Sequence, residues 1–278
     1  MDVLREYRDI YMALGDVHRA RAYIEAISRG GASDGTSTIA EKLAAVARGE
    51  TPPDLVQLRK SPRVKAMREL GSLYGVGPET AASWYRRGIR SLRDVRARMR
   101  EGRLELNHAQ AIGLKYYKHL HMRIPREHID AFAVNFRAVV PYQCVFAGSY
   151  RRGAADSGDI DILVYAGVRP RIQNILTACP PVVVMSSGPE KTSAVYLIAG
   201  IHRHVDIICM REESAAAALL YLTGSAEFNE RMRGHAKAIG YKLNQHGLYA
   251  DGVLVNTRTE RDIFAKLNMK YLSPARRI

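Results

Sequence analysis

Two aspartates stand two residues apart in an apolar run: Asp159 and Asp161 lie within residues 159–164, which read DIDILV. Alternate residues of a β-strand project from the same face, so the run predicts a strand with both carboxylates on one side and apolar side chains on the other. Carboxylate oxygens are ligands that Mg²⁺ prefers, and paired acids that hold divalent metal serve phosphoryl transfer. The pair alone is also typical of a surface salt-bridge network.

A third acid stands alone in a second apolar run. Asp206 is the only charged residue in residues 205–208, which read VDII. Burying a carboxylate costs free energy unless a metal ion or another cation compensates it. We therefore predict that Asp206 lies on a strand next to that of Asp159 and Asp161, so that three carboxylates converge on one site for a pair of metal ions.

Groups that bind phosphate flank the first pair of acids. A Gly-Ser turn lies upstream at residues 148–149, and a Ser-Gly pair lies at residues 157–158. Backbone N–H groups, hydroxyls and arginine side chains are the usual donors to phosphate oxygens. The donors expected here are Ser149, Arg152, Ser157 and Gly158. The neighbouring Arg151 either faces solvent or pairs with an acid.

The elements that must position these residues differ between the two halves of the chain. Up to about residue 125, apolar residues recur at helical spacing, as in Leu4, Tyr7, Ile10 and Tyr11. Beyond that point, short β-rich runs alternate with turns. They predict strands over 144–146, 161–165, 181–185, 194–198 and 204–208. Helices return over 214–228 and 231–239, which indicates an α+β chain of several modules.

One turn in the helical half has the form of a DNA-backbone contact. Residues 73–82 read LYGVGPETAA, a helix end, the tight turn Gly75-Val76-Gly77, and Pro78 at the start of the next helix. In such a helix-hairpin-helix, the exposed N–H groups at the helix start bind a DNA phosphate without reading bases. The alternative is an ordinary helix–helix connection with a glycine at the helix end.

The composition indicates a folded protein with a polyanionic partner. The 278 residues are 47% hydrophobic and 25% charged, and the formal net charge is +14. Neutralising phosphates supplies most non-specific affinity for nucleic acid, so nucleic acid is the leading candidate; a basic surface indifferent to nucleic acid is the alternative.

The cysteine content and hydropathy indicate a soluble intracellular protein. The three cysteines form no CxxC pair, and no apolar stretch approaches membrane-spanning length. We therefore expect a monomer without a disulfide framework, zinc site or membrane attachment. The sequence favours none of the nuclear, cytoplasmic and viral settings.

Several long motifs, in order, resemble those of the family X DNA polymerases, in the layout of their beta-type members. The strongest run from Gly148 to Asp161 (GSxRRGxxxSGDxD), from Tyr221 to Asn229 (YLTGSxxFN) and from Gly240 to Leu248 (GYKLNQHGL). Weaker matches are residues 106–117, 123–127 and 259–264. The resemblance covers nearly the whole chain.

The resemblance implies an α+β fold of four modules. Residues 1–60 would form an all-helical lyase-like domain of the 8-kDa type, and residues 61–125 a helix-hairpin-helix DNA-binding domain. Residues 126–211 would form the nucleotidyltransferase palm on a mainly antiparallel or mixed sheet. Residues 212–278 would form a small α+β module that selects nucleotide and template.

The resemblance also implies roles for individual residues. Asp159, Asp161 and Asp206 would hold two Mg²⁺ ions, for which Mn²⁺ can substitute. The incoming dNTP would be bound by Ser149, Arg152, Ser157, Gly158 and Arg123 at its triphosphate, by Tyr221, Thr223 and Gly224 at its sugar, and by Asn229 at its base. Arg233 would reach the template, and the Gly75-Val76-Gly77 turn would bind DNA together with a Na⁺ or K⁺ ion. His204 replaces an arginine that usually flanks the third aspartate.

The N-terminal module departs further from the family pattern. By resemblance, Lys42 is the nucleophile of a 5′-deoxyribose phosphate lyase, with Arg19 and Tyr23 in its phosphate pocket. Such a lysine must be neutral, so its pKa must be lowered by desolvation or nearby cations. Asp34 and Thr36 replace hairpin glycines, and Thr38 and Pro53 replace pocket lysines. In the alternative interpretation Lys42 is an exposed helix residue.

These observations predict a DNA polymerase that fills short gaps in nicked or gapped DNA during repair of the base-excision type, with lyase activity as an addition. One alternative is a template-independent terminal nucleotidyltransferase. Another is a DNA-end-binding protein without catalysis.

Overall fold

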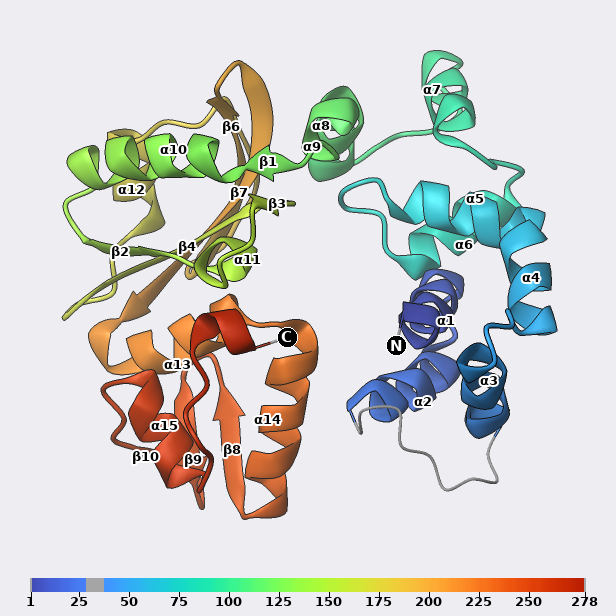
Figure 1. Cartoon of the computed structure of the whole chain (residues 1–278). Coiled ribbons are helices and arrows are strands. Elements are labelled where there is room, and N and C mark those ends of the chain that lie inside the picture. The colour runs from blue at the N-terminus through green and yellow to red at the C-terminus, as the bar shows by residue number, and fades with distance from the viewer. Residues whose placement is uncertain (1, 29–37, 278) are drawn as a thin grey trace. The chain divides into compact units, whose positions relative to one another are not determined.

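The structure is a computed structural model that describes residues 2–28 and 38–277. Residues 34 and 36, which the sequence places in the first hairpin, lie outside the described residues. Contacts divide the chain into two compact units, Met1–Lys115 and Tyr116–Ile278. The fold is α+β, as expected (Figure 1).

Helices are the regular elements of the described part of the first unit. Its helices are α1 (Asp2–Leu14), α2 (Val17–Ser28), α3 (Thr38–Ala47), α4 (Pro53–Lys60), α5 (Pro62–Gly71), α6 (Pro78–Arg86), α7 (Leu92–Arg100) and α8 (His108–Lys115). Aromatic residues at helical spacing form its first core, because Tyr7 and Tyr11 of α1 stack against Tyr23 of α2, with ring centroids 4.8 and 5.7 Å from that of Tyr23.

The second unit contains all the strands of the described residues. Its elements are α9 (Tyr117–Leu120), β1 (Ile124–Pro125), α10 (Arg126–Val139), β2 (Gln143–Phe146), α11 (Gly148–Arg151), β3 (Asp156–Ser157), β4 (Ile160–Ala166), α12 (Ile172–Ala178), β5 (Val183–Ser187), β6 (Lys191–Ile198), β7 (Ile201–Arg211), α13 (Glu212–Thr223), α14 (Ala226–Ala238), β8 (Tyr241–Asn244), β9 (Gly247–Ala250), β10 (Val253–Val255), α15 (Glu260–Lys266) and the 3₁₀ turn η1 (Pro274–Arg276).

A five-stranded sheet in the order β2-β4-β7-β6-β5 forms the centre of this unit. Strands β4 and β7 are parallel, and the other neighbours are antiparallel. The small strands β1 and β3 pair separately. The sheet is thus mixed and mainly antiparallel, as the resemblance implies.

Alternation along β4 and β7 gives the sheet one apolar and one functional face. Ile162 and Ile207, both fully buried, belong to a core that includes residues of α10 and α12. The other face carries Asp161 and Asp206 together with apolar residues that pack against α13. In Figure 1, α10 and α12 lie next to the sheet, and α13–α15 lie together with β8–β10 below it.

The C-terminal module is an antiparallel meander in the order β10-β9-β8 covered by helices. Its core includes Phe228 of α14 and Phe264 of α15, with ring centroids 6.0 Å apart. Helix α15 begins at a capping box in which Thr259 accepts from the Asp262 backbone N–H and Asp262 accepts from that of Thr259. Along the described part of the chain, no helix combines the length and apolar character needed to cross a membrane.

Candidate active site

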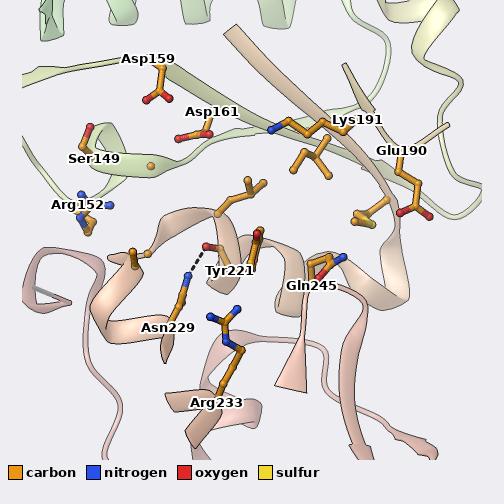
Figure 2. A pocket seen from close by; sticks show the side chains of 16 residues that line it. Ser149, Arg152, Asp159, Asp161, Glu190, Lys191, Tyr221, Asn229, Arg233 and Gln245 are labelled. Carbon is orange, nitrogen blue, oxygen red and sulfur yellow. Dashed lines mark hydrogen bonds between the residues drawn. The ribbon is translucent and has the colours of Figure 1, made fainter. Parts of the chain in front are cut away.

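Two of the three predicted acids face each other across neighbouring strands. In the parallel pair β4/β7, Asp161 and Asp206 are register partners and therefore project from the same face. Asp159 lies in the bend just before β4, which begins at Ile160, so the prediction that both acids of the first pair lie on the strand is wrong for Asp159. Asp159 nonetheless lines the same cavity as Asp161 (Figure 2).

Asp161 is buried close to the two other acids. Burial and the nearby charges of Asp159 and Asp206 raise the pKa of its carboxyl to about 7. Ionising all of these neighbouring carboxyls costs free energy because their negative charges repel each other. A bound divalent cation would offset that repulsion.

The side chain of Asp206 already has cationic and hydroxyl partners. Its Oδ2 lies 2.7 Å from Lys191 Nζ, its Oδ1 lies 3.2 Å from His204 Nε2, and the Ser193 hydroxyl donates to Oδ1. Burial opposes ionisation, but the bonds from His204, Lys191 and Ser193 outweigh it and hold the pKa of Asp206 well below its usual range. His204 thus takes the place beside Asp206 that the resemblance gives to arginine.

The donor set fits a hard divalent cation in its chemistry, since it consists of carboxylate oxygens. Among residues 2–28 and 38–277, no three His, Cys, Asp or Glu side chains are already gathered closely enough to hold an ion. At Asp206, one oxygen is taken by the Lys191 ammonium. An ion bound by all three aspartates would therefore share this carboxylate with Lys191 or compete with it.

The turn predicted to bind phosphate touches Asp161 directly. Gly148 begins α11 with a φ of +56°, and a Cβ at this position would collide with the Asp161 carboxylate. Only glycine allows this approach. The next residue, Ser149, donates its hydroxyl to Ser157 Oγ at 2.8 Å, so the two predicted phosphate-binding serines are brought together.

The backbone at the C-terminal end of α13 holds the side chain of Arg152 in place. Its Nη1 donates to the Thr223 backbone carbonyl at 2.6 Å. Gly224 has a φ of +66°, and a Cβ there would lie 3.3 Å from Arg152 Nη1, so a side chain would crowd the guanidinium. The backbone at the end of α13 therefore determines where this arginine lies.

Arg151, whose role the sequence left open, pairs with a buried acid. Its guanidinium donates to both oxygens of Glu260 at 3.0 and 2.8 Å and to Thr223 Oγ1 at 2.7 Å. Arg277, fully buried, donates to Glu260 Oε1 at 2.6 Å. Burial raises the pKa of Glu260, but bonds from Arg151 and then Arg277 outweigh it and lower the pKa overall. This network ties α11 to the C-terminal module.

A cavity of about 560 Å³ lies over the acids. The predicted residues that line it are Gly148, Ser149, Arg152, Asp159, Asp161, Tyr221, Gly224, Asn229 and Arg233. The predicted residues outside this lining are Asp206, Ser157, Gly158, Arg123 and Thr223. Figure 2 shows Ser149 and Arg152 at one end of the cavity and Glu190 and Gln245 at the other, with the acids above and Arg233 below.

Sequence reasoning missed three polar residues of this cavity, namely Glu190, Lys191 and Gln245. Lys191 begins β6 and follows Glu190, and both lie between the predicted strands 181–185 and 194–198, where no motif was found. Gln245 lies within the motif of residues 240–248, which was the signal that could have identified it.

Two predicted residues are held by contacts of their own. Asn229 Nδ2 donates to the Tyr221 backbone carbonyl at 2.6 Å, which keeps the amide at the cavity wall (Figure 2). Arg123 is paired with Asp156, with Nη2 2.7 Å from Oδ1, and lies 3.3 Å from the point where a Gly158 Cβ would be. Arg123 therefore borders the Ser-Gly pair without lining the cavity.

Two helices joined by a turn lie in the first unit at the position of the predicted helix-hairpin-helix. Helix α5 ends at Gly71 and α6 begins at Pro78, with Gly77 at its N-cap. The turn is fixed by Gln110 Nε2, which donates to the Gly75 carbonyl at 2.9 Å, and by the Val76 N–H, which donates to the Leu73 carbonyl at 3.0 Å.

Lys42 lies in an aromatic and acidic pocket of the first unit. Its Nζ is 2.7 Å from Asp54 Oδ2, 2.8 Å from Tyr23 Oη and 4.2 Å from the centroid of the Tyr7 ring. Burial would lower the pKa of Lys42, but hydrogen bonds to Asp54 and Tyr23 outweigh it and raise the pKa. This is opposite to the shift that a Schiff-base lysine needs. Arg19 is mostly exposed and pairs with Asp16 at 3.5 Å.

Family profiles match three consecutive parts of the chain. The profile of the fingers domain of DNA polymerase lambda matches residues 68–121, that of the DNA polymerase beta palm matches residues 123–178, and that of the DNA polymerase beta thumb matches residues 218–278. The palm match includes Asp159 and Asp161, and the thumb match includes Asn229 and Arg233.

Similar proteins come from animals and plants. DNA polymerase lambda of Rattus norvegicus is 34% identical over 250 residues, covering 78% of this chain and 43% of that protein. DNA polymerase lambda of Arabidopsis thaliana is 27% identical over 252 residues, covering 77% and 47%. DNA-directed DNA/RNA polymerase mu of Homo sapiens is 26% identical over 274 residues, covering 81% and 54%. The chain thus spans about half the length of these relatives.

Proposed function

The chain belongs to the family X DNA polymerases, and from this premise we propose that it fills short gaps in DNA by adding templated deoxynucleotides to a primer 3′-hydroxyl. The observation that carries the proposal is the in-register pair Asp161 and Asp206. The pair lies beside a cavity that has hydrogen-bond donors suited to phosphate, Ser149 and Arg152, at one end. This arrangement suits two-metal nucleotidyl transfer.

The residues divide into groups with separate tasks. Asp159, Asp161 and Asp206 would hold two Mg²⁺ ions, which when bound would activate the 3′-hydroxyl and stabilise the leaving pyrophosphate. Binding of the triphosphate would fall to Ser149, Arg152, Ser157 and Gly158, with Arg123 at its border. Tyr221 and the backbone of Thr223 and Gly224 would pack against the sugar and disfavour a 2′-hydroxyl.

Selection of a templated base would depend on helix α14. Asn229 and Arg233 lie one helical turn apart, and both line the cavity. Asn229 would reach the minor-groove edge of the incoming base, and Arg233 the template strand. This pair favours a templated polymerase over a nucleotidyltransferase that acts on small molecules.

The partners are gapped or nicked DNA and dNTPs. The hairpin turn Gly75-Val76-Gly77 would bind DNA phosphates, aided by a Na⁺ or K⁺ ion on its carbonyls. We propose the four modules 1–60, 61–125, 126–211 and 212–278, acting as a monomer in DNA repair. Matches to the fingers, palm and thumb profiles support the last three modules.

Primer extension on a one-nucleotide gap tests the function. With Mg²⁺ and the four dNTPs, we expect addition of the complementary nucleotide, and slower extension without a 5′-phosphate at the gap. A single-stranded primer is the matched substrate for terminal transfer. Equal incorporation on that primer would favour the terminal transferase, and DNA binding without extension would favour the non-catalytic protein.

Lyase chemistry at Lys42 should be limited by Asp54. Because Asp54 and Tyr23 keep the lysine protonated, we expect weak borohydride trapping on an incised abasic site, rising with pH. Asp54→Asn removes the main contact that raises the pKa of Lys42 and should therefore increase trapping at neutral pH. Lys42→Ala is the control and should abolish trapping. Strong trapping by Lys42→Ala would assign the nucleophile to another lysine.

A further inference from the structure

A second, smaller cavity in the same unit is lined by three arginines. It has a volume of about 310 Å³ and is bounded by Val168, Arg169, Pro170, Arg171, Pro189 and Arg211. These residues come from three segments, namely the one after β4, the turn between β5 and β6, and the end of β7. The fold, rather than the sequence, therefore brings these guanidinium groups together.

The positive charge of this cavity is only partly neutralised. Arg169 Nη1 donates to Glu190 Oε1 at 2.6 Å, and Arg211 Nη1 lies 3.9 Å from Glu213 Oε1, beyond hydrogen-bond distance. The Arg171 side chain has no ion pair or side-chain hydrogen bond with any described residue. Like charges that converge repel each other, and a bound anion would offset that repulsion.

The arginine cavity adjoins the active site through Glu190. This residue lines the large cavity and holds Arg169, and the preceding Pro189 lines the small cavity. Figure 2 places Glu190 and Gln245 across from Ser149 and Arg152. With a triphosphate at Ser149 and Arg152, the nucleotide would extend away from that end to its base contact Asn229, and the template contact Arg233 lines the same cavity as Glu190.

We propose that the cavity formed by Arg169, Arg171 and Arg211 binds one phosphodiester of the template strand. The inference rests on the proposed function, since it takes the template to lie at the base end of the nucleotide cavity. Arginine suits this role because its planar guanidinium can donate two parallel hydrogen bonds to phosphate oxygens. The contact would hold the strand without reading its sequence. The same chemistry would accept a free phosphate or pyrophosphate, so the test must separate these sources.

Equilibrium binding of gapped DNA, without nucleotide, measures the contact directly. Arg171→Gln should weaken binding about eightfold at 0.1 M salt and reduce the salt dependence by about one phosphate. Arg171 makes no internal contact that the change would break, so folding should be preserved. Arg137→Gln, the same charge loss on α10, is the matched control and should bind like the wild type, because α10 packs on the other face of the sheet.

Uncharged methylphosphonate linkages identify the strand. A single linkage at one template position should weaken the wild type by the same factor and leave Arg171→Gln unaffected. The assignment would be overturned if the linkage that affects only the wild type lay in the primer, or if no linkage had this effect. It would also be overturned if pyrophosphate protected Arg171 from a guanidine-modifying reagent without displacing DNA. Absence of any DNA binding by the wild type would instead overturn the proposed function along with this inference. Loss of polymerase activity alone would leave the binding result standing.

Discussion

Asp206→Asn is expected to lower the rate of nucleotide addition about a thousandfold. The substitution removes the negative charge of one of the two carboxylates that are register partners across β4 and β7. A metal held at such a site contributes several kcal/mol to stabilising the transition state, and about 1.4 kcal/mol corresponds to each tenfold change in rate. Binding of gapped DNA should change little, since the hairpin and basic side chains remain.

Single-turnover extension on gapped DNA, with Mg²⁺ at saturation, measures this effect. Asp251→Asn, at an exposed turn between β9 and β10, is the matched control and should extend at the wild-type rate. Extension by Asp206→Asn at a rate near that of the control would remove Asp206 from the catalytic group. Anisotropy with the same DNA shows whether binding is retained.

Glu260→Gln should destabilise the second unit by about 3–5 kcal/mol, the usual effect of breaking a buried ion pair from one side. Glu260 lies between Arg151 and Arg277, and Arg277 is fully buried. The neutral amide would leave both guanidinium groups without their counter-charge. Urea unfolding followed by far-UV circular dichroism measures the loss, with Glu230→Gln, exposed on α14, as the control without effect.

The same carboxylate gives stability a defined pH dependence. Because the pKa of Glu260 is lowered in the folded protein, the unfolded chain takes up a proton more readily. The contribution of the network is therefore complete above the ordinary glutamate value of about 4.3 and is lost as pH falls below it. Glu260→Gln should lose less stability than the wild type on acidification through that range. Equal losses for the two proteins would show that Glu260 does not titrate as its contacts require.

The sequence predicted local structure well where the pattern is local. The apolar runs located β4 and β7, and Asp206 lies on a strand next to that of Asp161, as predicted; the register that pairs the two residues comes from the structure. The error at Asp159 concerns a strand boundary, since the turn that contains Gly158 delays the start of β4. Boundaries depend on pairing with neighbours, which periodicity does not encode.

Partners distant in sequence could not be predicted from residue types. Arg151 and Glu260 are 109 residues apart, so the choice between solvent and an acid depended on the tertiary fold. Lys42 shows that a distant partner can also reverse the chemistry that a local motif suggests. The motif around Lys42 suggested a nucleophile, but Asp54 of another helix reverses the direction of its pKa shift.

Fully buried Arg277 also acts as a clamp between distant parts of the C-terminal module. Its guanidinium lies 5.5–5.6 Å from the ring centroids of Phe228, Phe264 and Tyr271, and its carbonyl accepts from the Ser225 N–H at 3.1 Å. Replacing Arg277 by alanine would therefore loosen α14 and α15 from each other as well as leave Glu260 with one partner fewer.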